Sequence, residues 1–255
     1  MAVKKIRAKV VSQKQIGSDV YDLVLSVGDM AKEARPGQFI SMYSNDKSKL
    51  LPRPISICGI EGEEGTLRVV YRTVGEGTKE FSAMVPGDTL DVIGPLGNGF
   101  IMKKKKAILM GGGIGIPPML ELAKQLDCEK TVVLGYRDEI FLADEFQEAA
   151  KVVIASEDGK TGTKGNVLDA VRESKITGDI IYACGPTPML KAIKAYAEEM
   201  GMEAQISLEE RMACGIGACL ACVCKSKEVD HHTYVHNKRI CKDGPVFDAK
   251  EVEFE

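Results

Sequence analysis

The chain has 255 residues, of which 44% are hydrophobic and 28% are charged, and its formal net charge is -3. At about 100 to 150 residues per domain, this length has room for two domains and a small appendage, and the near-neutral charge argues against nucleic-acid binding. No stretch approaches the roughly 20 apolar residues of a membrane helix, and the alternating N-terminal segment lacks the apolar core of a signal peptide. We therefore expect a cytoplasmic protein without a membrane partner.

The first hundred residues contain short β-rich runs that are separated by turn signals. The turns lie at Pro36 and Gly37, at 61–65, and at Pro86 and Gly87. The runs cover residues 5–11, 20–27, 38–43, 67–74 and 89–93, with a further strand-like segment at 57–60. This spacing predicts a small antiparallel β barrel, to which we assign residues 1–102. The lysine run 103–106 is interpreted as a solvated seam after it.

From residue 107 onward the pattern changes to strands that alternate with helices. Strand-like segments at 108–110, 131–136, 152–156 and 180–184 are interleaved with helical segments at 119–126 and 187–200. Such alternation predicts a parallel α/β sheet, and we assign residues 103–206 to this second domain. The remaining residues, 207–255, form a cysteine-bearing tail whose last ten residues resemble a closing strand.

Two glycine-bearing turns follow strands of the predicted α/β domain. The first is made of Gly111, Gly112, Gly113, Ile114 and Gly115 and precedes a helix opened by two prolines; the second is made of Cys184, Gly185 and Pro186. Glycines at a strand-to-helix turn let a backbone approach a pyrophosphate, and ligands bind beyond the carboxyl ends of parallel strands. We expect NAD in the crevice between these turns. A tight turn without a ligand is the alternative for the first, and a small apolar strand-end residue is the alternative for Cys184.

Four cysteines in the tail have the spacing of an iron–sulfur site. Cys214, Cys219 and Cys222 follow the pattern C-x4-C-x2-C, and Cys241 lies 19 positions further on. A [2Fe-2S] cluster needs four converging thiolates, and a tight loop with glycines can supply three of them together with N–H donors. Structural zinc is the alternative, although zinc sites more often pair two short cysteine knuckles.

The other metal-binding side chains of the tail are interpreted as bystanders. Cys224 lies two positions beyond Cys222, and we expect it not to be a ligand. His231, His232 and His236 fall in a polar segment that we interpret as an exposed loop, since a Rieske site needs two cysteines and two histidines in matched pairs. The crowding of five of the eight cysteines between 214 and 241 favours a metal cluster in a reducing compartment over disulfides.

Motifs in the predicted barrel make the interpretation specific. Arg53, Pro54, Ile55 and Ser56 form an R-P-x-S tetrad, and a G-x-G-T segment at 75–78 comes soon after Tyr71 and Arg72. Together with the two glycine turns, in this order, they resemble the ferredoxin reductase superfamily. The sequences RMACGIGACLACVCK and ICKDGPVF narrow the resemblance to the electron-transfer subunits of NAD-dependent (type B) dihydroorotate dehydrogenase. The likeness covers essentially the whole chain.

This resemblance implies a set of cofactors and partners. It implies a [2Fe-2S] cluster on Cys214, Cys219, Cys222 and Cys241, and an FMN-containing catalytic subunit joined with this chain in a heterotetramer of two copies of each. Electrons would run from dihydroorotate through FMN, the cluster and FAD to NAD⁺, in pyrimidine biosynthesis. The residues implied to hold FAD are Arg53, Pro54, Ile55, Ser56, Val70, Tyr71, Arg72, Gly77 and Thr78.

The chemistry of these side chains suits the implied roles. The guanidinium of Arg53 offers a permanently charged planar fork to a flavin diphosphate, and the Ser56 hydroxyl is short enough to donate near a flavin ring nitrogen. A surface ion pair is the alternative for Arg53, and Tyr71 is equally suited to stack on the flavin or to fill the barrel. With hydride chemistry on the cofactors, we expect no catalytic side chain on this chain.

Two other functions stay open on the sequence alone. One is a related flavin and iron–sulfur NAD(P)H oxidoreductase subunit, of the ferredoxin or sulfide dehydrogenase type, which contains the same modules. The other, more distant, is a zinc-binding protein without enzymatic activity.

The residues after the strand-like segment 131–136 bear on the choice between NAD and NADP. Arg137 is followed by Asp138 and Glu139, so a 2′-phosphate could find the arginine but would meet acidic neighbours. We therefore favour NAD over NADP.

Overall fold

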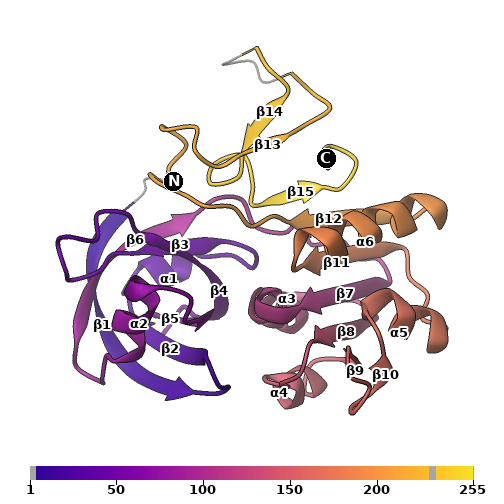
Figure 1. The fold of residues 1–255 in the computed structure, drawn as a ribbon, viewed down its shortest axis with the longest axis horizontal. Coiled ribbons are helices and arrows are strands. Elements are labelled where there is room, and N and C mark those ends of the chain that lie inside the picture. The colour runs from indigo at the N-terminus through magenta and orange to yellow at the C-terminus, as the bar shows by residue number, and fades with distance from the viewer. Residues whose placement is uncertain (1–3, 230–233, 255) are drawn as a thin grey trace.

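The first unit of the fold is a closed antiparallel barrel of six strands. The computed structural model of the protein describes residues 4–229 and 234–254. The strand order around the barrel is β1-β2-β5-β4-β3-β6, and Figure 1 shows the barrel in indigo and purple. The bounds are β1 Lys4–Gln15, β2 Val20–Ser26, β3 Phe39–Met42, β4 Arg53–Glu61, β5 Thr66–Arg72 and β6 Thr89–Leu96, with the short helices α1 Met30–Glu33 and α2 Glu76–Ser82.

Side-chain alternation along the strands fills the barrel. In β3, Ile40 and Met42 lie in the barrel core, whereas Phe39 packs on the outside in the core of the α/β unit. This is the period of two that a strand with both faces covered shows. The predicted barrel is therefore confirmed.

One local prediction for the barrel is wrong. The strand-like segment predicted at 57–60 starts too late, because β4 begins at Arg53, where Arg53 pairs with Met42 and Ser56 with Phe39 on β3. The pairing of β4 with β5 begins only at Ile57. Pro54 is tolerated in the strand because no β5 partner lies beside it to need its missing N–H.

The second unit is a seven-stranded sheet in the order β10-β9-β8-β7-β11-β12-β15, in which all neighbours are parallel except β12 and β15. The strands are β7 Ala107–Gly112, β8 Lys130–Tyr136, β9 Lys151–Ser156, β10 Thr163–Lys164, β11 Ile180–Cys184, β12 Glu203–Ser207 and β15 Val246–Asp248. The helices are α3 Pro117–Gln125, α4 Ala143–Gln147, α5 Val167–Glu173 and α6 Thr187–Glu199, and a 3-10 turn, η1, covers Gly113–Gly115. The predicted parallel α/β unit is confirmed.

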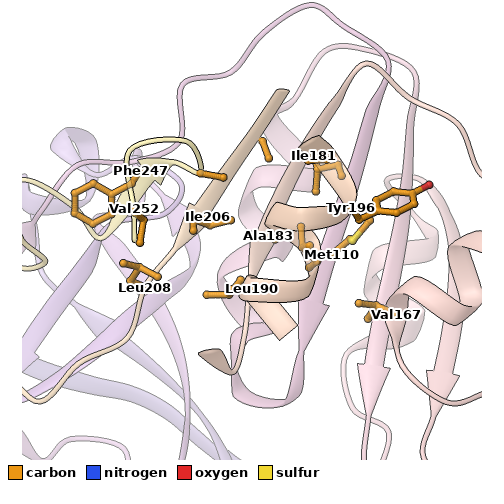
Figure 2. Packing of buried hydrophobic residues seen from close by; sticks show 14 of the residues in the cluster. Met110, Val167, Ile181, Ala183, Leu190, Tyr196, Ile206, Leu208, Phe247 and Val252 are labelled. Carbon is orange, nitrogen blue, oxygen red and sulfur yellow. The ribbon is translucent and has the colours of Figure 1, made fainter. Parts of the chain in front are cut away.

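Alternate residues of the central strands face the two helical layers. Leu109 packs with the helices α3 and α4, whereas Met110 packs with α5 and α6. Figure 2 shows the second of these cores, in which Leu190 and Tyr196 of α6 lie over Ile181 and Ala183 of β11. Such burial on both faces explains why these strands read as continuous apolar runs.

The cysteine-bearing tail is joined to both other units. It contains the two-stranded sheet of β13 Val223–Lys225 and β14 Asn237–Arg239, followed by β15 near its end. Of the predicted closing strand 246–255, only residues 246–248 form a strand, β15, which is antiparallel to β12 and completes the sheet of the second unit. Phe247 and Val252 extend the same hydrophobic core, beside Ile206 and Leu208 (Figure 2). In Figure 1 this tail lies across the junction of barrel and sheet.

Polar contacts fix the barrel against the α/β unit. Arg68 of β5 bonds to Asp22 of the barrel and to Glu145 of α4 through its guanidinium nitrogens. The buried carboxylate of Glu121 on α3 accepts a hydrogen bond from the backbone N–H of Ile60 at 3.0 Å.

Within the described part of the chain, no helix is long and apolar enough to span a membrane.

Candidate cofactor cavity and cysteine loop

A cavity of about 980 Å³ opens where the three units meet. It forms because β4 and β5 stop pairing at Ile57 and Val69, which leaves Arg53 to Ser56 on one wall and Val70 to Arg72 on the other. The α/β unit contributes Ile114, and the tail contributes the segment from Leu208 to Met212. Eight of the nine residues expected to hold FAD line this one cavity: Arg53, Pro54, Ile55, Ser56, Val70, Tyr71, Arg72 and Thr78.

The ninth residue, Gly77, lies directly under the guanidinium of Arg53. A Cβ at Gly77 would approach Nε of Arg53 to 2.2 Å and Cζ to 2.4 Å, so any side chain here would displace the guanidinium. Among the described residues no carboxylate lies within ion-pair distance of Arg53, and its Nη1 donates to the backbone carbonyl of Leu51. The surface ion pair considered for Arg53 is therefore not formed, and the guanidinium keeps donors for a ligand in the cavity.

Two other residues of the set make contacts that limit their roles. The Thr78 hydroxyl donates to the carbonyl of Gly75 at 3.0 Å and accepts the N–H of Val74 at 3.0 Å, so it holds the start of α2. The ring of Tyr71 is 1% exposed and lies edge-on to Phe81 inside the barrel. Burial raises the pKa of the Tyr71 phenol. Both residues support the wall of the cavity more than they offer free polar groups to it.

The two glycine turns lie against each other at the ends of neighbouring strands. Gly111 pairs with Cys184 in the register of β7 and β11. A Cβ at Gly115 would lie 2.5 Å from the backbone of Cys184 and Gly185, and a Cβ at Gly112 would lie 2.5 Å from Sδ of Met189. The predicted apposition is therefore present, and close backbone packing is what these glycines allow.

Most residues of the two apposed turns are buried, and only three are partly or fully exposed. Gly111, Gly112, Gly115, Cys184 and Gly185 are buried, whereas Gly113 and Ile114 are partly exposed and Pro186 is exposed. Burial raises the pKa of the Cys184 thiol, which suits the small apolar strand-end interpretation. Ile114 is the residue of the first turn that reaches the cavity wall.

Sequence reasoning missed the segment from Leu208 to Met212, which follows β12 and lines the cavity. Glu209 is open to solvent on the cavity side, yet desolvation by the surrounding protein raises the pKa of its carboxyl. The missed signal was the charged run Glu209, Glu210 and Arg211 directly after a buried strand, because the carboxyl end of β12 lies at the same edge of the sheet as that of β11.

The four predicted metal ligands lie near one another in the folded tail. Backbone N–H groups of Ile216 and Ala218 point at Sγ of Cys214, and the N–H of Cys241 points at Sγ of Cys222 at 3.4 Å. Although desolvation opposes it, hydrogen bonds from Ile216, from Cys219 and from Ala218 lower the pKa of the Cys214 thiol to about 6. Burial and a hydrogen bond with Cys222 raise the pKa of Cys241 to about 12. Cys214 thus neighbours Cys219, and Cys222 neighbours Cys241.

This pairing fits a binuclear cluster better than a single ion. In the described ranges 4–229 and 234–254, no three histidine, cysteine or acidic side chains are grouped so that they could share one metal ion. A zinc site needs such a group, whereas a [2Fe-2S] cluster takes two thiolates on each iron. The N–H groups aimed at sulfur supply the donors that thiolates and sulfides accept.

Cys224 and His236, which we interpret as bystanders, make contacts of their own with backbone carbonyls. The Cys224 thiol donates to the carbonyl of Lys238 at 3.5 Å, and burial raises its pKa to about 11. The Nδ1 atom of His236 lies 3.0 Å from the carbonyl of Lys227, and the side chain is exposed. His231 and His232 fall outside the described residues.

Three family models match successive parts of the chain. Residues 7–100 match an oxidoreductase FAD-binding domain, 109–195 match an oxidoreductase NAD-binding domain, and 209–253 match the iron–sulfur cluster binding domain of dihydroorotate dehydrogenase B. These boundaries lie inside the three regions that we assigned to separate units.

Curated relatives are similar over nearly their full length. The dihydroorotate dehydrogenase B (NAD(+)) electron transfer subunit of Caldanaerobacter subterraneus subsp. tengcongensis is 44% identical over 252 residues, which is 98% of this chain and 99% of the relative. The subunit of the same name from Listeria innocua is 44% identical over 253 residues, 96% of this chain and 97% of the relative.

Among solved structures, a chain of the NADH-dependent reduced ferredoxin-NADP oxidoreductase superposes with a TM-score of 0.87 at 32% identity. The structure of that enzyme was described in relation to flavin-based electron bifurcation. The superposition covers 96% of this chain and 89% of the other. The flavohemoglobin of Malassezia yamatoensis superposes with a TM-score of 0.65 at 22% identity, covering 79% and 60%, and shows the fold alone.

Proposed function

This chain belongs to the family of dihydroorotate dehydrogenase B electron transfer subunits, and from that premise we propose that it carries electrons between a catalytic partner subunit and NAD⁺. It is an oxidoreductase subunit with domains for FAD, NAD and an iron–sulfur cluster. The observation that carries the proposal is a cavity to which all three units contribute, because electron transfer between cofactors requires that their sites adjoin.

We place FAD in this cavity. Arg53 and the backbone around Gly77 would bind its diphosphate, and Ser56 would donate toward the flavin ring. When bound, FAD exchanges hydride with a nicotinamide and single electrons with an iron–sulfur cluster. Pro54 and Ile55 fix the wall that presents these groups, while Val70 and Tyr71 give the apolar opposite wall, next to Arg72.

NAD would enter at the apposed glycine turns. The turns end at Ile114, which already forms part of the cavity wall, so a nicotinamide held there would reach the flavin from the α/β side. Arg137 pairs with Asp138 at 3.4 Å, and Glu139 accepts hydrogen bonds from Ser18. This acidic setting would repel a 2′-phosphate, in agreement with the NAD(+) in the names of the relatives.

The cluster would be held by Cys214 and Cys219 on one side and by Cys222 and Cys241 on the other. Met212 lines the cavity, and Cys214 is only two positions further along the chain. The loop that carries Cys214, Cys219 and Cys222 therefore begins at the cavity edge. The N–H groups of Ile216, Gly217 and Ala218 aimed at cysteine sulfurs would stabilise negative charge there.

The partner subunit would supply the substrate chemistry. Within the described residues, the sheets are the six-stranded barrel, the seven-stranded sheet and the β13–β14 pair, and none of them is the (β/α)8 barrel expected of an FMN site. We propose an FMN-containing dihydroorotate-oxidising subunit, two copies of each chain in the assembly, and a role in pyrimidine biosynthesis. All eight cysteines are free, which suits the reducing cytoplasm.

The test is anaerobic coexpression with an FMN-containing dihydroorotate subunit, followed by flavin, iron and sulfide analysis and an assay of dihydroorotate-dependent NAD⁺ reduction. We expect FAD, two irons and that activity in one complex of equal chain stoichiometry. Zinc without flavin would overturn the proposal.

One other function is favoured by a specific observation. The chain from the NADH-dependent reduced ferredoxin-NADP oxidoreductase superposes over 96% of this protein, so the same modules also serve an electron-bifurcating system. If the coexpressed protein contains flavin and iron but has no dihydroorotate-dependent activity, the partner would be an electron-bifurcating system of this kind.

A further inference from the structure

Ser41 carries an unpartnered hydroxyl at the interface between the barrel and the cysteine loop. Its side chain is 1% exposed, and among the described residues its Oγ has no hydrogen-bond partner. Burial of a hydroxyl without a partner costs free energy, and such groups are rare in folded proteins. An orphaned donor at this place therefore calls for an acceptor that the polypeptide itself does not supply.

The orientation of Ser41 follows from strand alternation. Its neighbours Ile40 and Met42 lie in the barrel core, so Ser41 faces outward, on the same side of β3 as Phe39. Phe39 lines the cofactor cavity. The outward face of this short strand thus leads from the cavity to Ser41.

The residue opposite the Ser41 hydroxyl is Gly215, which directly follows the cysteine Cys214. A Cβ at Gly215 would lie 2.9 Å from Oγ of Ser41 and 3.6 Å from Cδ1 of Leu96, and Gly215 has a φ of +69°. A side chain here would collide with the hydroxyl. The glycine therefore lets the loop that carries Cys214 and Cys219 pack directly against Ser41.

The barrel also holds the segment that carries the fourth cysteine. The backbone N–H of Asn98 donates to the carbonyl of Gly244 at 2.6 Å, and its side-chain amide donates to the carbonyl of Asp243 at 2.9 Å. A Cβ at Gly97 would lie 2.5 Å from Cδ of Pro245. The segment after Cys241 is thus held at the end of β6, while Gly215 of the loop with the other cysteines lies against Ser41 on β3.

We propose that the Ser41 hydroxyl donates a hydrogen bond to the iron–sulfur cluster, at a sulfur on the Cys214 side, and that it raises the reduction potential of the cluster. Sulfur atoms of a bound cluster are the acceptors expected beside Gly215, and a donor stabilises the reduced form because that form carries one more negative charge. Ser41 would then be a positioning and tuning residue that joins the flavin unit to the cluster. This inference rests on the cluster of the proposed function.

The test is a redox titration of the purified complex with FAD and cluster bound, read by the EPR signal of the reduced cluster. Ser41→Ala removes the donor, and we expect the ratio of reduced to oxidised cluster at a fixed potential to fall about tenfold, which is about 59 mV for one electron. Ser41→Thr keeps the hydroxyl and should keep the potential. Ser12→Ala, on the exposed side of β1, is the matched control.

Three outcomes would overturn the inference. An unchanged cluster potential in Ser41→Ala would show that the hydroxyl bonds to water only, and an equal fall in Ser41→Thr would show a packing effect. If the alanine variant does not load its cluster, Ser41→Cys is titrated instead; as a weaker donor of similar size it should lower the potential, and no change contradicts the inference. Iron and sulfide missing from the wild-type complex would instead refute the proposed function, so the two failures are distinguishable.

Discussion

The backbone N–H of Gly217 donates to Sγ of Cys241 at 3.1 Å, across 24 residues of chain. Arg239 reinforces this link, because its Nη1 donates to the carbonyl of Gly217 while its guanidinium also bonds to Asp243. The fourth cysteine is therefore fixed against the loop of the other three by polypeptide contacts alone. These contacts bring the four cysteines together without a bound metal.

Gly217→Ala should weaken cluster retention. Gly217 has a φ of +84°, and a Cβ there would lie 2.6 Å from Cδ of Lys242. The left-handed conformation costs an L-residue about 1–2 kcal/mol, and relief of the clash would move the N–H away from Cys241. We expect a lower iron and sulfide content per chain with FAD content unchanged.

The control for this variant is Gly201→Ala. Gly201 has a φ of +65° after α6, and a Cβ there would have nothing within 4 Å. It therefore carries the same backbone strain far from the cysteines. Equal cluster loss in both variants would show that global destabilisation, and not the loop, is responsible.

Cys219→Ser should remove the cluster and spare the flavin. Cys219 is an exposed thiol beside Cys214, whereas the FAD cavity is formed by other residues. We expect loss of iron and sulfide but largely intact NADH-to-dye reduction through FAD. Cys224→Ser is the matched control, since the Cys224 thiol donates to Lys238 and should not be a ligand. Loss of NADH-to-dye reduction together with the iron and sulfide would contradict the separation of the two sites.

The course of the chain explains what could be predicted from the sequence. Alternating apolar residues and turn signals predict the barrel, and buried runs followed by glycine turns predict β7 and β11 with their ends together. Local patterns cannot predict that β4 and β5 separate at Ile57, because the register of two strands depends on the whole barrel.

The contacts between units could not be predicted either. The segment Leu208 to Met212 has no periodic pattern, and its place in the cavity depends on how β12 and β15 complete the sheet. Likewise, Ser41 is an ordinary strand serine in the sequence, and only the packing of Gly215 against it shows that its hydroxyl is buried without a partner.

Gly77→Ala should lower the affinity for FAD. The added Cβ would lie 2.2 Å from Nε of Arg53, so the guanidinium must move. If that guanidinium bonds to the diphosphate, its loss costs about 1.5–3 kcal/mol, or roughly ten- to a hundredfold in Kd. Fluorescence titration of FAD into the deflavinated protein measures the change. Lys79→Ala, an exposed position on the same helix, should bind FAD like the wild type.

Gly115→Ala should impair use of NADH without loss of FAD. A Cβ at Gly115 would lie 2.5 Å from three backbone atoms of Cys184 and Gly185, and backbone cannot rotate away as a side chain can. The two turns must separate, so the KM for NADH should rise. Steady-state dye reduction at matched FAD content gives the comparison, and an unchanged KM would place the nicotinamide cofactor elsewhere.

The contact between Arg68 and Glu145 should make stability depend on pH. Hydrogen bonding from Arg68 holds the pKa of the Glu145 carboxyl below its usual value of 4.5. A group whose folded pKa is lowered stabilises the fold above the unfolded pKa, and this contribution disappears as the pH falls through the folded pKa. The stabilisation should therefore be complete near neutral pH and decline below 4.5.

Glu145→Gln tests this contact between the barrel and the α/β unit. Since Glu145 is 36% exposed, we expect the substitution to cost only about 1 kcal/mol near neutral pH, measured by urea unfolding at matched FAD content. The difference from the wild type should shrink as the pH falls below 4.5. Glu148→Gln, an exposed neighbour, should behave like the wild type at every pH. A difference that stays constant on acidification would mean that the shape of the side chain, and not its charge, joins the two units.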